Sequence, residues 1–108
     1  MEVWEEFLES ANDDYNKGRY TVAVRNYATA IFLLIDKYLR EKHNVSVKSH
    51  QDRFHILKEL SKNDMKIKKI LEIYEITFEI YRKTYYIKLA KEEADILNKY
   101  VNEIRRII

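Results

Sequence analysis

Apolar residues recur every three to four positions through most of the chain, which is typical of amphipathic helices. The first run predicts a helix whose opposite face is acidic, and its apolar positions are Trp4, Phe7, Leu8, Ala11 and Tyr15. Asn16 and Gly18 should end this helix, because glycine adopts the left-handed conformation that closes a helix at little cost. A second helix, from about residue 21 to residue 42, has an apolar arc too wide for one neighbour, so it should be the central and most buried helix.

Three further helical patterns follow the second helix. Ser49 precedes Asp52 by three residues, a variant of the capping box that predicts a short helix with Phe54, Leu57 and Leu60 facing inward. Residues 61–64 supply the next turn and cap, and a long helix follows. The last helix lies beyond a boundary near residues 84 to 88. We therefore expect an all-α protein, with one domain over residues 1–108 that folds as an antiparallel, up-and-down bundle of four to five helices.

The long helix carries two apolar stripes. The stripe expected to face the core comprises Ile67, Ile70, Leu71, Tyr74, Thr77, Phe78 and Tyr81. The second stripe consists of Ile73, Ile76 and Ile80. A small monomer has little reason to expose a second row of isoleucines to water, so we expect a partner subunit to cover it. This pattern predicts a homodimer.

The composition supports an all-helical fold and excludes some chemistry. The 108 residues include no cysteine, no proline and one glycine, with 46% hydrophobic and 35% charged residues. Disulfide and thiolate chemistry are therefore excluded.

The acidic start, MEVWEEFLES, is unlike a signal peptide, and no apolar run has the length of a membrane span. These two features predict a cytoplasmic protein that does not enter membranes. Abundant Lys, Glu, Ile and Tyr resemble the residue usage of heat-adapted, thermophile proteins.

Charge is distributed unevenly along the chain. Residues 1–15 hold acids and no base, whereas residues 37–69 hold ten bases and four acids. One end of the fold can therefore attract polyanions, although the net charge is +2. Arg25, in the second helix, is expected to reach an acid of the first helix, Glu5 or Glu9. The alternative interpretation places Arg25 in a cleft between helices or subunits.

The segment YNKGRYTVAVRNYATA, residues 15–30, resembles the middle of a tetratricopeptide repeat. Such a unit recurs about every 34 residues, but the equivalent positions one repeat beyond Ala23 and Ala30 are Leu57 and Asp64. The second helix also continues well beyond the length of a repeat helix. We interpret the run as a tight helical hairpin, in which Gly18 ends one helix and the two alanines let the next pack closely. A peptide-binding helical adaptor stays an alternative function.

The order of elements fits another family better. A polar first helix, the turn NKGRY, a long helix, a short loop ending in Ser-His and two further helices are together similar to the HEPN domain, a small helical bundle named for higher eukaryotes and prokaryotes nucleotide-binding. The residues that carry the resemblance are Gly18, Tyr20, Ala23, Tyr27, Ala28, Ala30, Ser49, His50 and Leu57, with the apolar run to Leu39. The resemblance implies a homodimer that cleaves RNA, binds RNA or a nucleotide, or pairs with a small nucleotidyltransferase in a toxin–antitoxin module.

Catalytic members of this family carry an Arg followed by four to six residues and a His. Here the histidines are His43, His50 and His55, and the nearest preceding arginines, Arg40 and Arg53, leave gaps of two, nine and one residues. No histidine follows the end of the long helix either. We therefore assign no catalytic residue. The alternative is a divergent, metal-independent ribonuclease that uses Arg53, His50 and His55.

The segment YRKTYYIKLAK interleaves basic and aromatic residues. Basic side chains neutralise phosphates, and tyrosine rings stack on unpaired bases. A packing role for the tyrosines with a solvated rim of lysines is the alternative. The candidate RNA- or anion-binding residues are Arg82, Lys83, Tyr85, Tyr86, Lys88 and Lys91, together with His50 and Arg53 from the short helix. His50 and His55 are five positions apart and point to different sides of a helix, so no metal site and no cofactor is expected.

Overall fold

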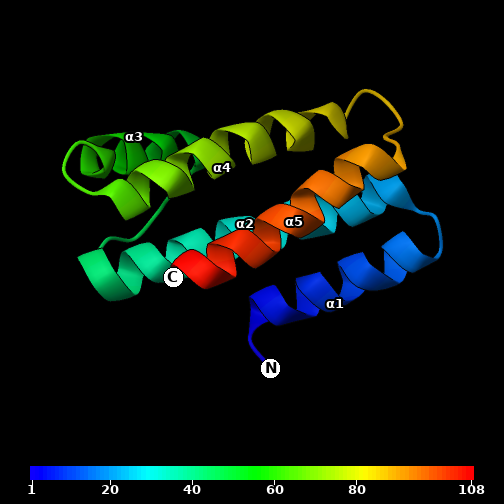
Figure 1. Ribbon diagram of the computed structural model, residues 1–108, viewed down its shortest axis with the longest axis horizontal. Coiled ribbons are helices and arrows are strands. Elements are labelled where there is room, and N and C mark those ends of the chain that lie inside the picture. Colours follow the sequence, from blue (N-terminus) through cyan, green and yellow to red (C-terminus); the bar gives the residue numbers. More distant parts are fainter.

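A computed structural model describes all 108 residues, which form five helices and no strands (Figure 1). The helices are α1 (Val3–Asn16), α2 (Tyr20–His43), α3 (His50–Ser61), α4 (Met65–Lys83) and α5 (Lys91–Ile107). The predicted all-α bundle is therefore confirmed. None of these helices combines the length and the apolar character that crossing a bilayer requires.

The central helix is α2, which packs against α1, α4 and α5, whereas α3 packs on α4. The hairpins α1–α2 and α4–α5 are antiparallel, and the non-consecutive helices α2 and α5 lie side by side and run in the same direction (Figure 1). Eleven residues of α2 are buried, as the width of its apolar arc predicts. Ala23 and Ala30 are among them, which agrees with their interpretation as close-packing positions.

Local sequence signals set the helix ends. Gly18 follows α1 with a φ of +74°, the left-handed conformation expected of it. Ser49 caps α3 by accepting a hydrogen bond from the N–H of Asp52 at 3.0 Å. The Asp52 carboxylate accepts from the N–H of Lys48 at 2.9 Å, one residue before the position used in a regular capping box. Asp64 caps α4 through its side chain, as predicted.

The second isoleucine stripe of α4 is mostly buried, contrary to the prediction. Ile73 is 2% exposed and Ile80 is 7% exposed, whereas Ile76 is 44% exposed. The reason is that α4 packs against three helices, α2, α3 and α5, so its buried arc is wider than one stripe. Ile73 and Ile80 are therefore core residues of one chain rather than dimer-interface residues. Ile76 is the member of the stripe that stays available for a partner.

Candidate nucleic-acid interface

The loop between α4 and α5, residues 84–90, is held at both ends. Thr84 Oγ1 donates to the carbonyl O of Tyr81 at 2.7 Å. At the other end, the Leu89 side chain is buried, and its N–H donates to Thr21 Oγ1 of α2 at 2.8 Å. Fixing both ends restricts the conformations of the residues between them, so less ordering entropy is lost when those residues bind a ligand.

Two tyrosines project from this loop. Tyr85 is 60% exposed and Tyr86 is 77% exposed, with Ile87 exposed beside them. The hydroxyls of Tyr81 and Tyr85 are 2.9 Å apart, and Arg25 Cζ lies 4.1 Å from the centroid of the Tyr85 ring. The hydrogen bond with Tyr81, together with the Arg25 guanidinium, lowers the pKa of Tyr85. One face of the Tyr85 ring is thus occupied, while Tyr86 stands free.

Arg25 does not pair with Glu5 or Glu9, so that prediction is wrong. Its guanidinium lies instead against the Tyr85 ring, on the side of α2 that faces the end of α4. Three helices, α1, α4 and α5, pack against α2, and the sequence pattern does not show which of them a polar side chain of α2 faces. The alternative interpretation, a position in a cleft between helices or subunits, stays untested, since Arg25 contacts Tyr85 in the loop after α4.

Basic residues flank the two tyrosines in the sequence. The four basic candidates of this segment are all exposed: Arg82, Lys83, Lys88 and Lys91. Arg82 Nη1 lies 3.9 Å from Glu79 Oε1, and the three lysines form no ion pair within 4.0 Å. The segment occupies the end of the bundle where α4 joins α5 (Figure 1). We call residues 82–91 the basic tyrosine loop.

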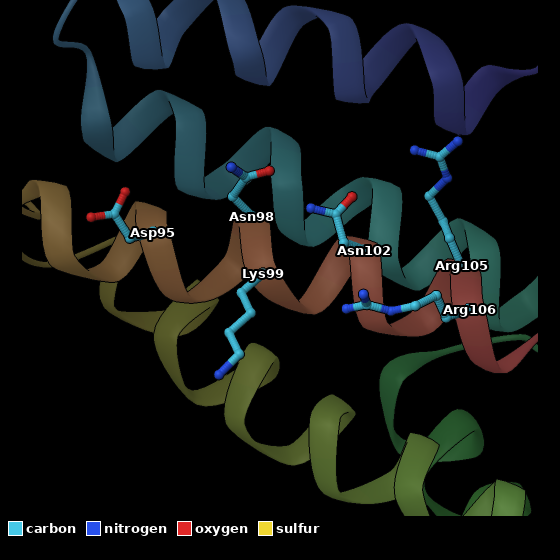
Figure 2. A pocket seen from close by; sticks show the side chains of 6 residues that line it. All are labelled: Asp95, Asn98, Lys99, Asn102, Arg105 and Arg106. Carbon is cyan, nitrogen blue, oxygen red and sulfur yellow. The ribbon is translucent and has the colours of Figure 1, made fainter.

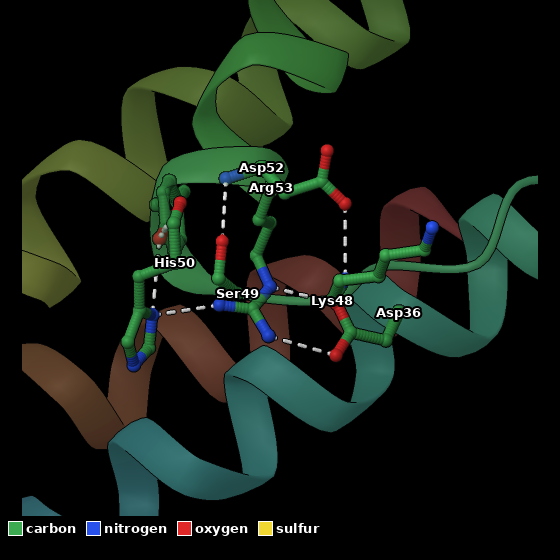
Figure 3. A network of polar contacts seen from close by, with 7 residues as sticks. Asp36, Lys48, Ser49, His50, Asp52 and Arg53 are labelled. Carbon is green, nitrogen blue, oxygen red and sulfur yellow. Dashed lines mark hydrogen bonds and ion pairs between the residues drawn. The ribbon is translucent and has the colours of Figure 1, made fainter.

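His50 and Arg53 lie elsewhere, in a polar network between α2, α3 and α4 (Figure 3). Arg53 Nε and Nη2 donate to the two carboxylate oxygens of Asp36 at 2.7 and 2.8 Å. Arg53 Nη1 lies 2.7 Å from His50 Nδ1, which must therefore be an unprotonated acceptor. The Tyr74 hydroxyl donates to the carbonyl O of His50 at 3.1 Å. We call Asp36, His50, Arg53 and Tyr74 the buried arginine network.

The geometry of this network corrects the anion-binding role predicted for Arg53. The residue is 7% exposed, and its guanidinium is engaged by both oxygens of Asp36, so its charge is not free for a phosphate. His55 is exposed on α3 and outside the network. The set proposed for a divergent ribonuclease, Arg53, His50 and His55, is therefore not assembled at one site. No group of three or more His, Cys, Asp or Glu side chains is placed to hold a metal ion.

A row of aromatic rings connects the buried arginine network to the basic tyrosine loop. The His50 ring centroid lies 4.8 Å from those of Phe32 and Phe78 and 5.9 Å from that of Tyr81. Tyr81 is in turn 5.7 Å from Tyr85. His50 thus acts as a packing and hydrogen-bonding residue at the start of α3, and the rings hold α3, α2 and the end of α4 in fixed register.

The protonation of His50 predicts a specific dependence of stability on pH. Burial, followed by the nearby Arg53 charge, lowers the pKa of His50 below its usual value of 6.5, against a weaker opposing effect of Asp36. The unfolded chain therefore binds more protons than the fold between the two pKa values, and His50 destabilises the fold as pH falls through that window. Replacing His50 with Gln should reduce the loss of Tm between about pH 7 and pH 5, measured by circular dichroism. His55→Gln is the matched control, and an unchanged loss in His50→Gln would contradict the assignment.

A second charged surface, which the sequence analysis missed, lies along α5. A polar hollow of about 670 Å³ is lined by Asp95, Asn98, Lys99, Asn102, Arg105 and Arg106. Figure 2 shows Lys99 extending toward α4 and Arg105 toward the start of α1, where its Cζ lies 5.3 Å from the Trp4 ring centroid. Lys99 and Arg106, seven positions apart on the exposed side of an amphipathic helix, are the signal that could have revealed this hollow.

The fold and these surfaces define an all-α bundle with a buried arginine network and an exposed, basic, tyrosine-rich loop. The family model of the HEPN domain matches residues 2–108, almost the whole chain. The chain therefore belongs to the HEPN domain family. No curated protein and no solved structure matches it.

Proposed function

We propose that this HEPN domain is a non-catalytic RNA- or nucleotide-binding module, and that it contacts single-stranded RNA through the basic tyrosine loop. The observation that carries the proposal is the exposed ring of Tyr86, next to Tyr85 in an anchored loop that also carries exposed lysines without ion partners. Basic side chains neutralise phosphates, and an exposed tyrosine ring offers a stacking platform for an unpaired base. The two contributions act at the same end of the bundle.

The buried arginine network supports binding without cleavage. An arginine that stabilises phosphate charge must reach the substrate, and Arg53 is buried against Asp36. The sequence also lacks the spacing of Arg and His that the catalytic members of the family use. We therefore expect mixed RNA to stay intact during incubation with the purified protein. Cleavage by the wild-type chain that is lost in His50→Ala would favour the ribonuclease alternative.

The partner we propose is a second copy of this chain, and a small nucleotidyltransferase is a further candidate. Exposed Ile76 on α4 is the position that favours the homodimer. Paired with a nucleotidyltransferase, the domain would work in a toxin–antitoxin module, and a cytoplasmic location stays a prediction. Copurification at native expression level identifies which protein accompanies the domain.

Substitutions in the basic tyrosine loop should weaken RNA binding in two separable ways. Tyr86→Ala removes an exposed ring that makes no internal hydrogen bond, and it should weaken binding by about tenfold because one stacked base is lost. Lys83→Ala with Lys88→Ala should lower the slope of log affinity against log salt by about 1.4, since each neutralised phosphate of a single strand contributes about 0.7. Fluorescence anisotropy with a short unstructured RNA measures both.

The polar hollow along α5 supplies the matched control. Lys99→Ala with Arg106→Ala removes the same charge from two exposed positions of α5, one in the middle of the helix and one near its C-terminal end. This variant should change the salt slope by less than half as much as the loop variant. Equal slopes for the two double variants, or unchanged affinity in Tyr86→Ala, would exclude the basic tyrosine loop as the binding site.

A further inference from the structure

A cavity of about 350 Å³ lies between α3 and α4. Its volume is in the range of small-molecule sites. Phe54 of α3 with Tyr74 and Phe78 of α4 provide aromatic walls, and Glu75 and Glu79 of α4 provide the charged groups. His50 and Gln51 complete the lining. We call this site the acidic aromatic cavity.

The aromatic walls favour a cation. The Tyr74 and Phe78 rings are stacked, with centroids 5.9 Å apart and planes inclined by 27°. Aromatic faces carry partial negative charge and attract ammonium and guanidinium groups. Cations of the chain itself already approach these rings, because Lys58 Nζ lies 5.5 Å from the Phe54 centroid and Arg82 Cζ lies 6.0 Å from that of Phe78.

The charged side chains that line the cavity are negative, and this charge also favours a cation. Glu75 and Glu79 are one helical turn apart, so their carboxylates rise from neighbouring positions on α4. Glu75 forms no ion pair within 4.0 Å, and Glu79 has a single long contact of 3.9 Å with the exposed Arg82. The positive charge of Arg53, which lies beside the aromatic residues of the cavity, is neutralised by its ion pair with Asp36. The cavity therefore presents the unpaired carboxylate of Glu75 and the weakly paired carboxylate of Glu79 beside aromatic faces.

We propose that the acidic aromatic cavity binds a linear alkyl polyamine. Its primary ammonium groups can donate charge-assisted hydrogen bonds to Glu75 and Glu79, and its methylene chain can pack on Phe54 and Phe78. A quaternary ammonium ligand can make cation–π contacts with the rings, but it has no N–H to donate to the carboxylates. A primary ammonium group can make both interactions, so a primary amine is the better ligand. The cavity adjoins the basic tyrosine loop at Arg82, which contacts Glu79 and Phe78, but none of its lining residues belongs to that loop. The proposal therefore does not depend on RNA binding.

Calorimetric titration of the full chain with putrescine and with spermidine tests this proposal. Saturable binding with one ligand per chain is expected, and tetramethylammonium should bind at least about tenfold more weakly. Glu75→Gln with Glu79→Gln should weaken polyamine binding by about tenfold or more, because both charged acceptors become neutral. Phe78→Leu keeps an apolar wall but removes the aromatic face, and should weaken binding by about fivefold.

Glu72→Gln is the matched control, since it removes the charge of an exposed glutamate on the same helix outside the cavity. The affinity of this variant should stay within about twofold of wild type, because the Glu72 carboxylate does not line the cavity and lies 4.0 Å from Lys69 Nζ. Circular dichroism spectra identical to wild type show that each variant is folded. The proposal is overturned by the absence of saturable polyamine binding in wild type, or by an equal loss in Glu72→Gln, which would indicate non-specific attraction to an acidic surface.

Discussion

Replacing Asp36 with Ala should lower the free energy of unfolding by about 3 to 5 kcal/mol, because it leaves a buried guanidinium without its counter-charge. Arg53 is 7% exposed, and both carboxylate oxygens of Asp36 accept its hydrogen bonds at 2.7 and 2.8 Å. Once Asp36 is removed, Arg53 keeps only neutral neighbours, which are His50 Nδ1 at 2.7 Å and the aromatic rings of Phe32 and Tyr74. A neutral imidazole cannot replace a carboxylate, so the loss is larger than that of an ordinary hydrogen bond. Urea denaturation followed by circular dichroism measures it.

The double variant Asp36→Leu with Arg53→Leu separates the charge from the packing. It removes both charges together, and it should be within about 2 kcal/mol of wild type although each single variant is far less stable. Lys37→Ala breaks a surface ion pair with Glu2 and should have little effect, which makes it the control for loss of an exposed pair. Equal stability of Asp36→Ala and Lys37→Ala would show that the Arg53–Asp36 pair does not hold α3 on the bundle.

The network also explains how α3 is positioned relative to the loop. Arg53 ties the first turn of α3 to α2, and the Tyr74 hydroxyl ties the His50 backbone to α4. His50 and Tyr81 then pack against each other, and Tyr81 shares a hydrogen bond with Tyr85 of the basic tyrosine loop. Weakening the Arg53–Asp36 ion pair should therefore disturb the acidic aromatic cavity before it disturbs the basic tyrosine loop, since α3 supplies one wall of the cavity.

The helices could be predicted from the sequence because their signals are local. Gly18 ends α1, Ser49 begins α3 and Asp64 begins α4, each through hydrogen bonding or backbone conformation within a few residues. The clustering of exposed basic and tyrosine residues in the basic tyrosine loop could also be predicted, since these residues are neighbours in the chain, whereas RNA binding by the loop stays a prediction. The wide apolar arc of α2 correctly indicated the central helix.

What could not be predicted depends on contacts distant in the sequence. Arg53 was expected to be available for anions, but its partner Asp36 is 17 residues away on another helix. Ile73 looked like part of a surface stripe, because periodicity shows which residues share a face and not how many helices cover that face. Arg25 likewise had several possible neighbours. These are the positions at which tertiary packing, rather than local pattern, determines the environment.

Lys substitutions in the second stripe of α4 should separate folding from association. Ile73→Lys places a charge in the core, where the wild-type side chain is 2% exposed, and should cost at least about 3 kcal/mol of unfolding free energy. Ile80 is 7% exposed and should respond in the same direction. Ile76→Lys affects a 44% exposed side chain, so the monomer should keep its stability to within about 0.5 kcal/mol. Urea denaturation of the three variants measures the difference.

The same variants test the proposed homodimer, because a charge at an apolar contact disfavours association while it leaves an exposed position of the monomer undisturbed. Light scattering after size exclusion should give twice the mass of one chain for wild type at micromolar concentration, and a single chain for folded Ile76→Lys. Ile96→Lys is the control, since Ile96 is 39% exposed on α5 rather than α4. A monomeric wild type removes the dimer proposal. A dimer that persists in Ile76→Lys but dissociates in Ile96→Lys would move the interface to α5, where the hollow with Lys99 and Arg106 would then be covered.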